Sequence, residues 1–397
     1  MRVRVGVALL LILAVLAAIQ YFRPIPAVAA TALLPSADVV QGATPALPWP
    51  ARGSAAVGVS GLGFIASSGN EQAIPAASVT KVMTALVALK DKPLLKGEAG
   101  PTITMTDTDV RAYQADLQGG QSVVKVESGE SLTEFQALQG MLIPSANNLA
   151  ETVARWDAGS IEAFVSRMND RATAMRLTHT KFADTSGASP ASVSTPSDLL
   201  TLGMAAMQDP VFAQIVGQAQ AELPVAGTVY NVNGVLGQSG IVGIKTGSGL
   251  NTGANYLFAA SLTVDNHEIL IYGCLMGQPS LPIAFSNAKA LIAAMSPALH
   301  VRRVVARNQS VATYTAPWGN ATDLVSQVDV DLAEWPGMVV RQRLNASSLA
   351  LDQPIPAGAR EGSMHVVLGD YDLDVPLVTS DPMYPPGRLW RLTRLTF

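Results

Sequence analysis

Residues 75–81 read Pro75-Ala76-Ala77-Ser78-Val79-Thr80-Lys81, and the stretch that follows them stays apolar to Leu89. Val82, Leu86 and Leu89 recur at helical spacing, which predicts a helix over residues 78–90. If Ser78 begins this helix, Lys81 lies one turn later on the same face. A neutral amine there can take the proton of a serine hydroxyl when burial and a neighbouring cation lower its pKa. The stretch therefore predicts a serine nucleophile, Ser78, with a lysine base, Lys81.

A second motif, Ser145-Ala146-Asn147, lies between two predicted helices and directly after Pro144, which breaks the chain there. A hydroxyl and an amide two residues apart in a loop can face the same cleft. Ser145 could pass a proton to a leaving amine, and Asn147 could bond a backbone amide of the substrate.

The third motif, Lys245-Thr246-Gly247, follows the apolar residues 241–244 and is expected on a strand. Lys245 would supply the cation that lowers the pKa of Lys81, and it would attract an anionic substrate end. Thr246 can bond a carboxylate, and Gly247 lets a substrate backbone lie close to the strand.

Each motif alone is weak evidence for a catalytic site, because the chain repeats the residue spacing of two of them elsewhere. Residues 122–125 repeat the serine–lysine spacing, but in a strand-like alternation that points Ser122 and Lys125 to opposite faces. Residues 68–70 repeat the serine–asparagine spacing in a hairpin-like turn. Taken singly, the motifs are a helix cap, a turn and a strand end; their joint order indicates one catalytic site.

The wider pattern predicts an α+β fold with one sheet backed by helices. Strand pairs are expected over 54–67 and over 255–264 with 268–276, and a strand over 122–126. Helices are expected from 131 and over 147–156, 160–177, 196–207 and 285–295. After residue 299, short alternating runs between turns predict a small all-β domain. The expected domains are thus 51–298, catalytic, and 299–397, β-rich, with a strand-like end at 388–395.

The N-terminus indicates export. Arg2 and Arg4 precede an apolar run from Val5 to Ile19, and residues 27–29 read Ala-Val-Ala, a cleavage pattern of secretory signals. Residues 1–23 are therefore a cleaved signal peptide or a retained membrane anchor, and either one places the rest outside the cytoplasm. Residues 24–50, rich in proline and alanine, are expected to form an extended tether.

Composition excludes other classes of function. The net charge of -4, without a basic cluster, argues against nucleic acid as a partner. The single cysteine, Cys274, lies in an apolar run and is expected to be a buried, inert thiol. Four scattered histidines offer no metal-binding spacing, so neither a metal nor a cofactor is expected.

The three motifs in this order resemble those of the penicillin-binding protein and serine β-lactamase superfamily. Within it, the chain is similar to the low-molecular-mass D-alanyl-D-alanine carboxypeptidases. The similar stretches are 75–81, 127–130, 142–148, 180–187, 194–199 and 243–247. The resemblance covers about residues 51–298, and the later β domain resembles the family's C-terminal accessory domain only loosely.

The resemblance implies an antiparallel sheet backed by helices, with a mainly helical subdomain. It implies a serine peptidase whose Ser78 is acylated by the D-Ala-D-Ala end of a peptidoglycan stem peptide, with release of the last D-alanine. Water would then cleave the acyl-enzyme. The implied oxyanion hole consists of the backbone N–H groups of Ser78 and Ser248. β-Lactams would acylate the same serine.

Two departures from the family pattern concern substrate and membrane binding. Residues 276–279 (Met-Gly-Gln-Pro) stand where the family often has an arginine for the substrate carboxylate, so Lys245 and Thr246 must hold more of it. The family's usual C-terminal amphipathic membrane helix is not apparent, so membrane attachment is expected from the N-terminal segment.

Three alternatives remain open. A class A β-lactamase shares the motifs, but it also needs a glutamate followed four residues later by an asparagine. Glu151, Glu162 and Glu222 are not followed by an asparagine at that spacing, so this ExxxN loop is missing. A transpeptidase differs only in passing the acyl group to an amine rather than to water. A non-catalytic wall-binding scaffold on the same fold would be expected to lose motif residues, and all of them are present.

Overall fold

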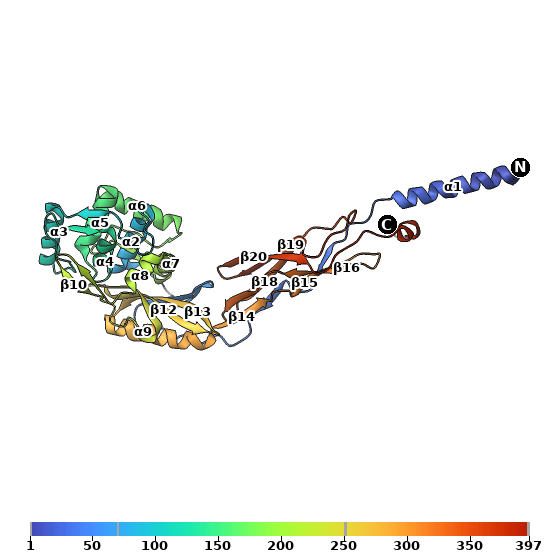
Figure 1. Cartoon of the computed structure of the whole chain (residues 1–397). Coiled ribbons are helices and arrows are strands. Elements are labelled where there is room, and N and C mark those ends of the chain that lie inside the picture. Colours follow the sequence, from blue (N-terminus) through green and yellow to red (C-terminus); the bar gives the residue numbers. More distant parts are fainter. Residues whose placement is uncertain (1, 70, 250–251, 395–397) are drawn as a thin grey trace. The chain divides into compact units, whose positions relative to one another are not determined.

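The computed structural model describes residues 2–69, 71–249 and 252–394 and forms two compact units (Figure 1). One unit is Ala43–His300, and the other combines Met1–Gly42 with Val301–Phe397.

The unit Ala43–His300 is built on a five-stranded antiparallel sheet. In spatial order its strands are β11 (Ile241–Gly249), β12 (Gly253–Val264), β13 (His267–Gln278), β3 (Ser54–Val59) and β4 (Gly63–Ser67). Every residue of β3 is buried, because helices cover both faces of the sheet. Helix α9 (Leu281–Met295) packs on one face, and α7 (Pro196–Ala206) packs on the other (Figure 1).

A mainly helical region adjoins the α7 side of this sheet. Its helices are α2 (Thr80–Asp91), α3 (Asp107–Gln118), α4 (Glu134–Leu142), α5 (Asn147–Ala158), α6 (Ile161–Ala174) and α8 (Pro210–Val216). Short strand pairs join β5 (Ile74–Pro75) to β8 (Val193–Ser194), β6 (Thr102–Thr104) to β7 (Ser131–Thr133), and β9 (Gln220–Leu223) to β10 (Gly227–Tyr230). The α+β prediction, with helices backing an antiparallel sheet, is confirmed.

The other unit holds a seven-stranded antiparallel sheet in the order β1-β15-β16-β20-β19-β18-β2. Its bounds are β1 (Ala30–Ala32), β2 (Ala37–Val39), β15 (Ser310–Thr315), β16 (Ala321–Ser326), β18 (Val339–Ala346), β19 (Arg360–Leu368) and β20 (Tyr371–Thr379). A separate pair joins β14 (His300–Val305) to β17 (Val330–Glu334). Helices α1 (Arg2–Phe22) and α10 (Arg388–Thr393) belong to this unit.

Part of the expected tether over 24–50 is sheet instead. β1 pairs with β15, and β2 pairs with β18, so this segment supplies both edge strands of the seven-stranded sheet. The pairing satisfies backbone groups of β15 and β18 that would otherwise lie unpaired at the sheet edge.

Two further local predictions are wrong. Residues 122–126 form no strand, because the N–H and C=O of Val124 bond the amide side chain of Asn148 instead of a neighbouring strand. Residues 388–393 form the helix α10 rather than a strand. Leu389 and Leu392 fit one helical turn as well as an alternation, and short apolar runs do not separate the two.

Candidate active site

A tight turn holds Ser78 at the start of α2. Ala77–Val79 form a short 3₁₀ turn, Ala77 adopts a left-handed φ of 49°, and α2 begins two residues after Ser78. The buried Asn255 of β12 donates to the carbonyls of Pro75 and Ala76 at 2.9 and 3.0 Å. Its oxygen accepts the N–H of Gly277. The central sheet thus fixes the loop that presents Ser78.

Lys81 lies below Ser78 and is fully buried. Its Nζ is 2.9 Å from Ser78 Oγ, 2.7 Å from Asn147 Oδ1 and 2.9 Å from the Ser186 carbonyl. Burial, and then the charge of Lys245, hold the pKa of Lys81 well below its ordinary value, although Asp184 and Asp116 act in the opposite direction. The arrangement favours a neutral amine within proton-transfer distance of the Ser78 hydroxyl.

The second motif lies in the loop between α4 and α5. Ser145 is buried and has a left-handed φ of 69°. Asn147 begins α5, and its side chain bonds Lys81 through Oδ1 and the Gln121 side chain through Nδ2, the latter at 3.0 Å. The Asn147 N–H also donates to the carbonyl of Ser122. The Asn147 side chain is therefore held by both Lys81 and Gln121.

The third motif lies on the edge strand β11, as predicted. Lys245 and Thr246 are buried, and Lys245 Nζ donates to the Thr246 carbonyl at 3.1 Å. Burial lowers the pKa of Lys245 to about 7. A Cβ on Gly247 would lie 3.0 Å from the backbone nitrogen of Ser78. Glycine at this position therefore keeps the space next to the Ser78 N–H open.

The motifs meet at a cavity of about 340 Å³. Ser78, Asn147 and Ser248 line it, together with Gln121, Gly187, Thr252 and neighbouring small residues. Lys81, Ser145, Lys245 and Thr246 are not among the described lining residues and are buried. The structure therefore brings Ser78, Asn147 and Ser248 to the surface of one cavity, whereas Lys81 and Lys245 are buried in the protein.

Residues 184–192 form a loop of the site. Its place next to Ser78 could not be predicted from the chemistry of its residues alone. The Ser186 carbonyl bonds Lys81, and Asp184 accepts hydrogen bonds from the Ser186 hydroxyl and the Ala188 N–H. The Ser192 hydroxyl donates to the other oxygen of Asp184. A Cβ on Gly187 would overlap the Ala77 carbonyl, so the loop lies directly against the Ser78 turn. The only sequence signal was the family resemblance of residues 180–187.

The side chains of the repeated motifs that the structure describes make no printed contact with the Ser78–Lys81 pair, although the backbone carbonyl of Ser122 accepts the Asn147 N–H. Lys125 is exposed and pairs with Glu127 at 2.8 Å. The Ser68 hydroxyl accepts the N–H of Ala55, whereas Asn70 lies outside the described residues. Cys274 is fully buried, and burial raises the pKa of its thiol, which confirms the prediction of a buried thiol.

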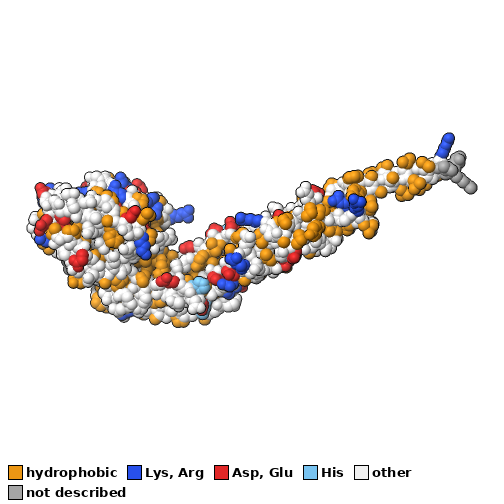
Figure 2. Space-filling view, viewed as in Figure 1, with side chains coloured by type: hydrophobic (Ala, Val, Ile, Leu, Met, Phe, Trp, Pro, Cys, Tyr) orange, Lys and Arg blue, Asp and Glu red, His pale blue; other side chains and the backbone are white. Residues whose placement is uncertain are grey.

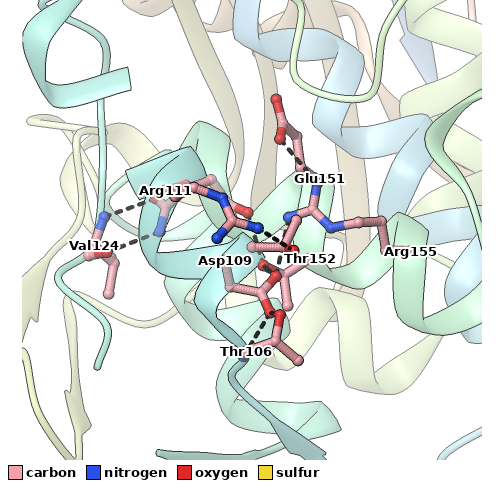
Figure 3. A network of polar contacts seen from close by, with 9 residues as sticks. Thr106, Asp109, Arg111, Val124, Glu151, Thr152 and Arg155 are labelled. Carbon is pink, nitrogen blue, oxygen red and sulfur yellow. Dashed lines mark hydrogen bonds and ion pairs between the residues drawn. The ribbon is translucent and has the colours of Figure 1, made fainter. Parts of the chain in front are cut away.

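A polar network fixes α5, the helix that carries Asn147, to α3 (Figure 3). Asp109 of α3 accepts hydrogen bonds from Thr106 at the helix start, and from Thr152 and Arg155 of α5 at 2.7 and 2.9 Å. Burial alone would raise the pKa of Asp109, but these hydrogen bonds outweigh it and lower the pKa. Asn148 ties the same helix to Val124.

Because the fold lowers the pKa of Asp109, its stabilising effect is present above the pKa that the carboxyl has when unfolded. The effect is lost as the pH falls through the folded-state value. We expect Asp109→Asn to lower the free energy of unfolding by about 2 kcal/mol at neutral pH and by less in acid. Urea unfolding followed by circular dichroism measures it. Asp170→Asn, at an exposed position on α6, is the control, and equal effects of the two substitutions would contradict the network's role.

Comparisons with known proteins place these features in a family. The family model described as D-alanyl-D-alanine carboxypeptidase (Peptidase_S11) matches residues 62–276. D-alanyl-D-alanine carboxypeptidase DacB2 of Mycobacterium tuberculosis is 35% identical over 153 residues, which are 38% of this chain and 48% of that protein. The chain thus matches about half the length of this relative.

Two further comparisons extend the match. The D-alanyl-D-alanine carboxypeptidase of Streptomyces sp. strain K15 is 28% identical over 54% of this chain and 76% of that protein. The crystal structure of penicillin binding protein 5 from Haemophilus influenzae has a TM-score of 0.63 at 20% identity, and covers 86% of this chain and 99% of that one. At this identity the structural match establishes the fold alone.

Proposed function

Because this chain belongs to the D-alanyl-D-alanine carboxypeptidase family, we propose that it removes the terminal D-alanine from peptidoglycan stem peptides and is acylated by β-lactams. The observation that carries the proposal is the 2.9 Å distance between the Lys81 amine and the Ser78 hydroxyl, with the amine fully buried. The proposed catalytic unit spans residues 51–298, and residues 299–397 are proposed to form an accessory β domain.

In the proposed reaction, Ser78 Oγ attacks the carbonyl carbon of the penultimate D-alanine while neutral Lys81 takes the hydroxyl proton. The N–H groups of Ser78 and Ser248 stabilise the oxyanion, a contribution of about 3 kcal/mol per donor in other enzymes. The C–N bond then breaks, and the proton that Lys81 took passes through the Ser145 hydroxyl to the departing D-alanine amine. Water cleaves the resulting ester and restores Ser78.

Substrate binding is assigned to the remaining motif residues. Asn147 bonds a backbone amide of the substrate, and Gly247 leaves room for its backbone against β11. Lys245 and Thr246 hold the terminal carboxylate. Gln278, in the region of the family's arginine, donates instead to the carbonyls of Arg52 and Met276, and this supports a carboxylate site that depends on Lys245 and Thr246.

The pH dependence tests the role of Lys245. With a pKa of about 7, Lys245 is charged below neutral pH and loses its charge above it. We therefore expect kcat/KM for penicillin acylation to fall as the pH rises through this range. Lys245→Arg keeps the cation at all these pH values, so the variant, although slower, should lose this falling limb. A falling limb retained in Lys245→Arg would contradict the assignment.

The product distribution tests the proposed activity against its rivals. A peptide ending in D-Ala-D-Ala is incubated with the protein, with and without a D-amino acid acceptor, and D-alanine and exchanged peptide are measured. D-Alanine release without acceptor supports the carboxypeptidase, and exchange without hydrolysis supports a transpeptidase. Rapid penicillin hydrolysis without peptide cleavage supports a β-lactamase. A β-lactamase would also need a carboxylate to drive deacylation, and the carboxylate of Glu151 is instead paired with Arg155 at 3.1 Å.

We propose that the protein acts outside the cytoplasm, in the cell envelope. The apolar helix α1 near the N-terminus supports export, as a signal or as an anchor.

A further inference from the structure

Asp184 begins the loop 184–192 and holds it with both oxygens of its carboxylate. One oxygen accepts the Ser186 hydroxyl at 2.9 Å and the Ala188 N–H at 2.8 Å. The other oxygen accepts the Ser192 hydroxyl. Hydrogen bonds to a charged group are stronger than those between neutral groups. This carboxylate therefore fixes the two ends of the loop relative to each other.

The two serines that Asp184 holds also contact the segments that carry the proposed base and nucleophile. The Ser186 carbonyl accepts a hydrogen bond from Lys81 Nζ at 2.9 Å. The Ser192 carbonyl accepts the N–H of Ala76 at 2.8 Å, directly before the turn that presents the nucleophile. The carboxylate is thus joined through one serine to the base and through the other to the turn of the nucleophile.

The loop is also bonded to helix α2, next to Lys81. The hydroxyl of Thr84, three residues after Lys81 on this helix, donates to the Thr185 carbonyl at 2.6 Å. Thr185, Ser186 and Ser192 are all buried, with at most 4% of each exposed. Because a protein interior is closely packed, a shift of the loop is passed on to the Lys81 amine and is not absorbed by solvent.

The charge of Asp184 acts on Lys81 as well. Burial and the charge of Lys245 on β11 lower the pKa of Lys81, whereas Asp184 in the loop and Asp116 on α3 raise it. Asp184 differs from Asp116 because its oxygens also hold the loop that contacts Lys81. Figure 2 shows charges of both signs scattered over the visible surface of the unit Ala43–His300, where water and salt screen them.

We propose that Asp184 is a positioning residue of the reaction, which holds the Lys81 amine against the Ser78 turn and acts on that amine by its negative charge. Asp184 is not among the described residues that line the cavity, so it acts through Lys81 and not on the substrate. Because this role rests on the proposed function, it is tested both with and without a substrate.

The hydrogen bonds are tested by two replacements of Asp184. Asp184→Ala removes them all and is expected to lower kcat/KM for penicillin acylation about 10²-fold, the usual cost of a small misplacement of reacting groups. Asp184→Asn should recover most of this loss, because its amide oxygen can accept from Ser186 and Ala188 and its amide nitrogen can donate to the Ser192 hydroxyl. Stopped-flow acylation measures the rates, and circular dichroism checks the fold. Acylation by Asp184→Ala at the wild-type rate would overturn the proposal.

The charge is tested by the pH profile of acylation, which a purely structural role would not move. Asp184→Asn lacks the negative charge that raises the pKa of Lys81, so the neutral amine should persist to lower pH. The acidic limb of kcat/KM should therefore move to lower pH in Asp184→Asn. Asp170→Asn, at an exposed position on α6, is the matched control and should keep the wild-type rate and limb. An acidic limb that stays in place in Asp184→Asn would contradict the proposal.

The same charge effect can be measured without a substrate. In protein labelled with isotope-enriched lysine, the ε-carbon resonance of Lys81 is assigned by its loss in Lys81→Arg and followed by NMR against pH. The midpoint of its titration should be lower in Asp184→Asn than in the wild type. Equal midpoints would refute the action of Asp184 on Lys81. A wild-type protein that forms no penicillin adduct would refute the proposed function alone, because this titration still tests Asp184.

Discussion

Replacement of Ser78 by alanine is expected to abolish the covalent penicillin adduct and to lower D-alanine release on the order of 10⁶-fold. Among its described hydrogen bonds, Lys81 Nζ reaches one hydroxyl, that of Ser78, and the backbone of the turn is held by Asn255 rather than by the serine side chain. The variant should therefore fold normally and still bind the peptide. Intact mass after incubation with penicillin, and D-alanine release in parallel, measure the loss.

Ser122→Ala is the matched control for Ser78→Ala. Ser122 has the same spacing to a lysine, but its described hydrogen bond to Asn147 is made by the backbone carbonyl, which alanine keeps. It should form the adduct at the wild-type rate. A strong loss at Ser122, or an adduct that survives in Ser78→Ala, would contradict the assignment of the nucleophile.

Lys81→Ala should slow acylation by about 10²- to 10⁴-fold, the usual contribution of a general base. Lys81→Arg should not rescue the rate, because a guanidinium stays protonated and cannot accept the serine proton. Stopped-flow acylation by a chromogenic β-lactam measures both rates. Asn147 and the Ser186 carbonyl also lose a partner in Lys81→Ala, so circular dichroism should accompany the measurement.

Lys125→Ala serves as the control for Lys81, since Lys125 is exposed and bonds only Glu127 among its described hydrogen bonds. It should acylate at the wild-type rate. Wild-type acylation by Lys81→Arg would show that an uncharged amine is not required, and the proposed base would then be wrong.

The motif residues were predictable because each one stands in a local pattern that fixes its surroundings. The apolar spacing after Ser78 predicted α2, the break at Pro144 predicted the loop of Ser145 and Asn147, and the apolar run before Lys245 predicted β11. These are short-range signals, and the structure brings all three segments to one cavity or directly below it.

What could not be predicted depends on contacts between distant residues. Asn255 lies far along the chain from Pro75, and the polarity of its side chain gave no sign that it anchors the Ser78 turn. Asn148 takes the backbone groups of Val124 and so prevents the expected strand. Residues 24–50 have the composition of a tether, and yet β1 and β2 find edge partners in a sheet formed mostly of residues after 300.

During turnover, Ser78 is proposed to carry an acyl group. The most direct test is the mass of the penicillin-treated protein, followed by digestion to locate the modified peptide, with D-alanine release measured on the same preparation. We expect one adduct per chain, on the peptide that contains Ser78, together with D-alanine release. A protein that remains unmodified and releases no D-alanine would contradict it and would favour a non-catalytic scaffold.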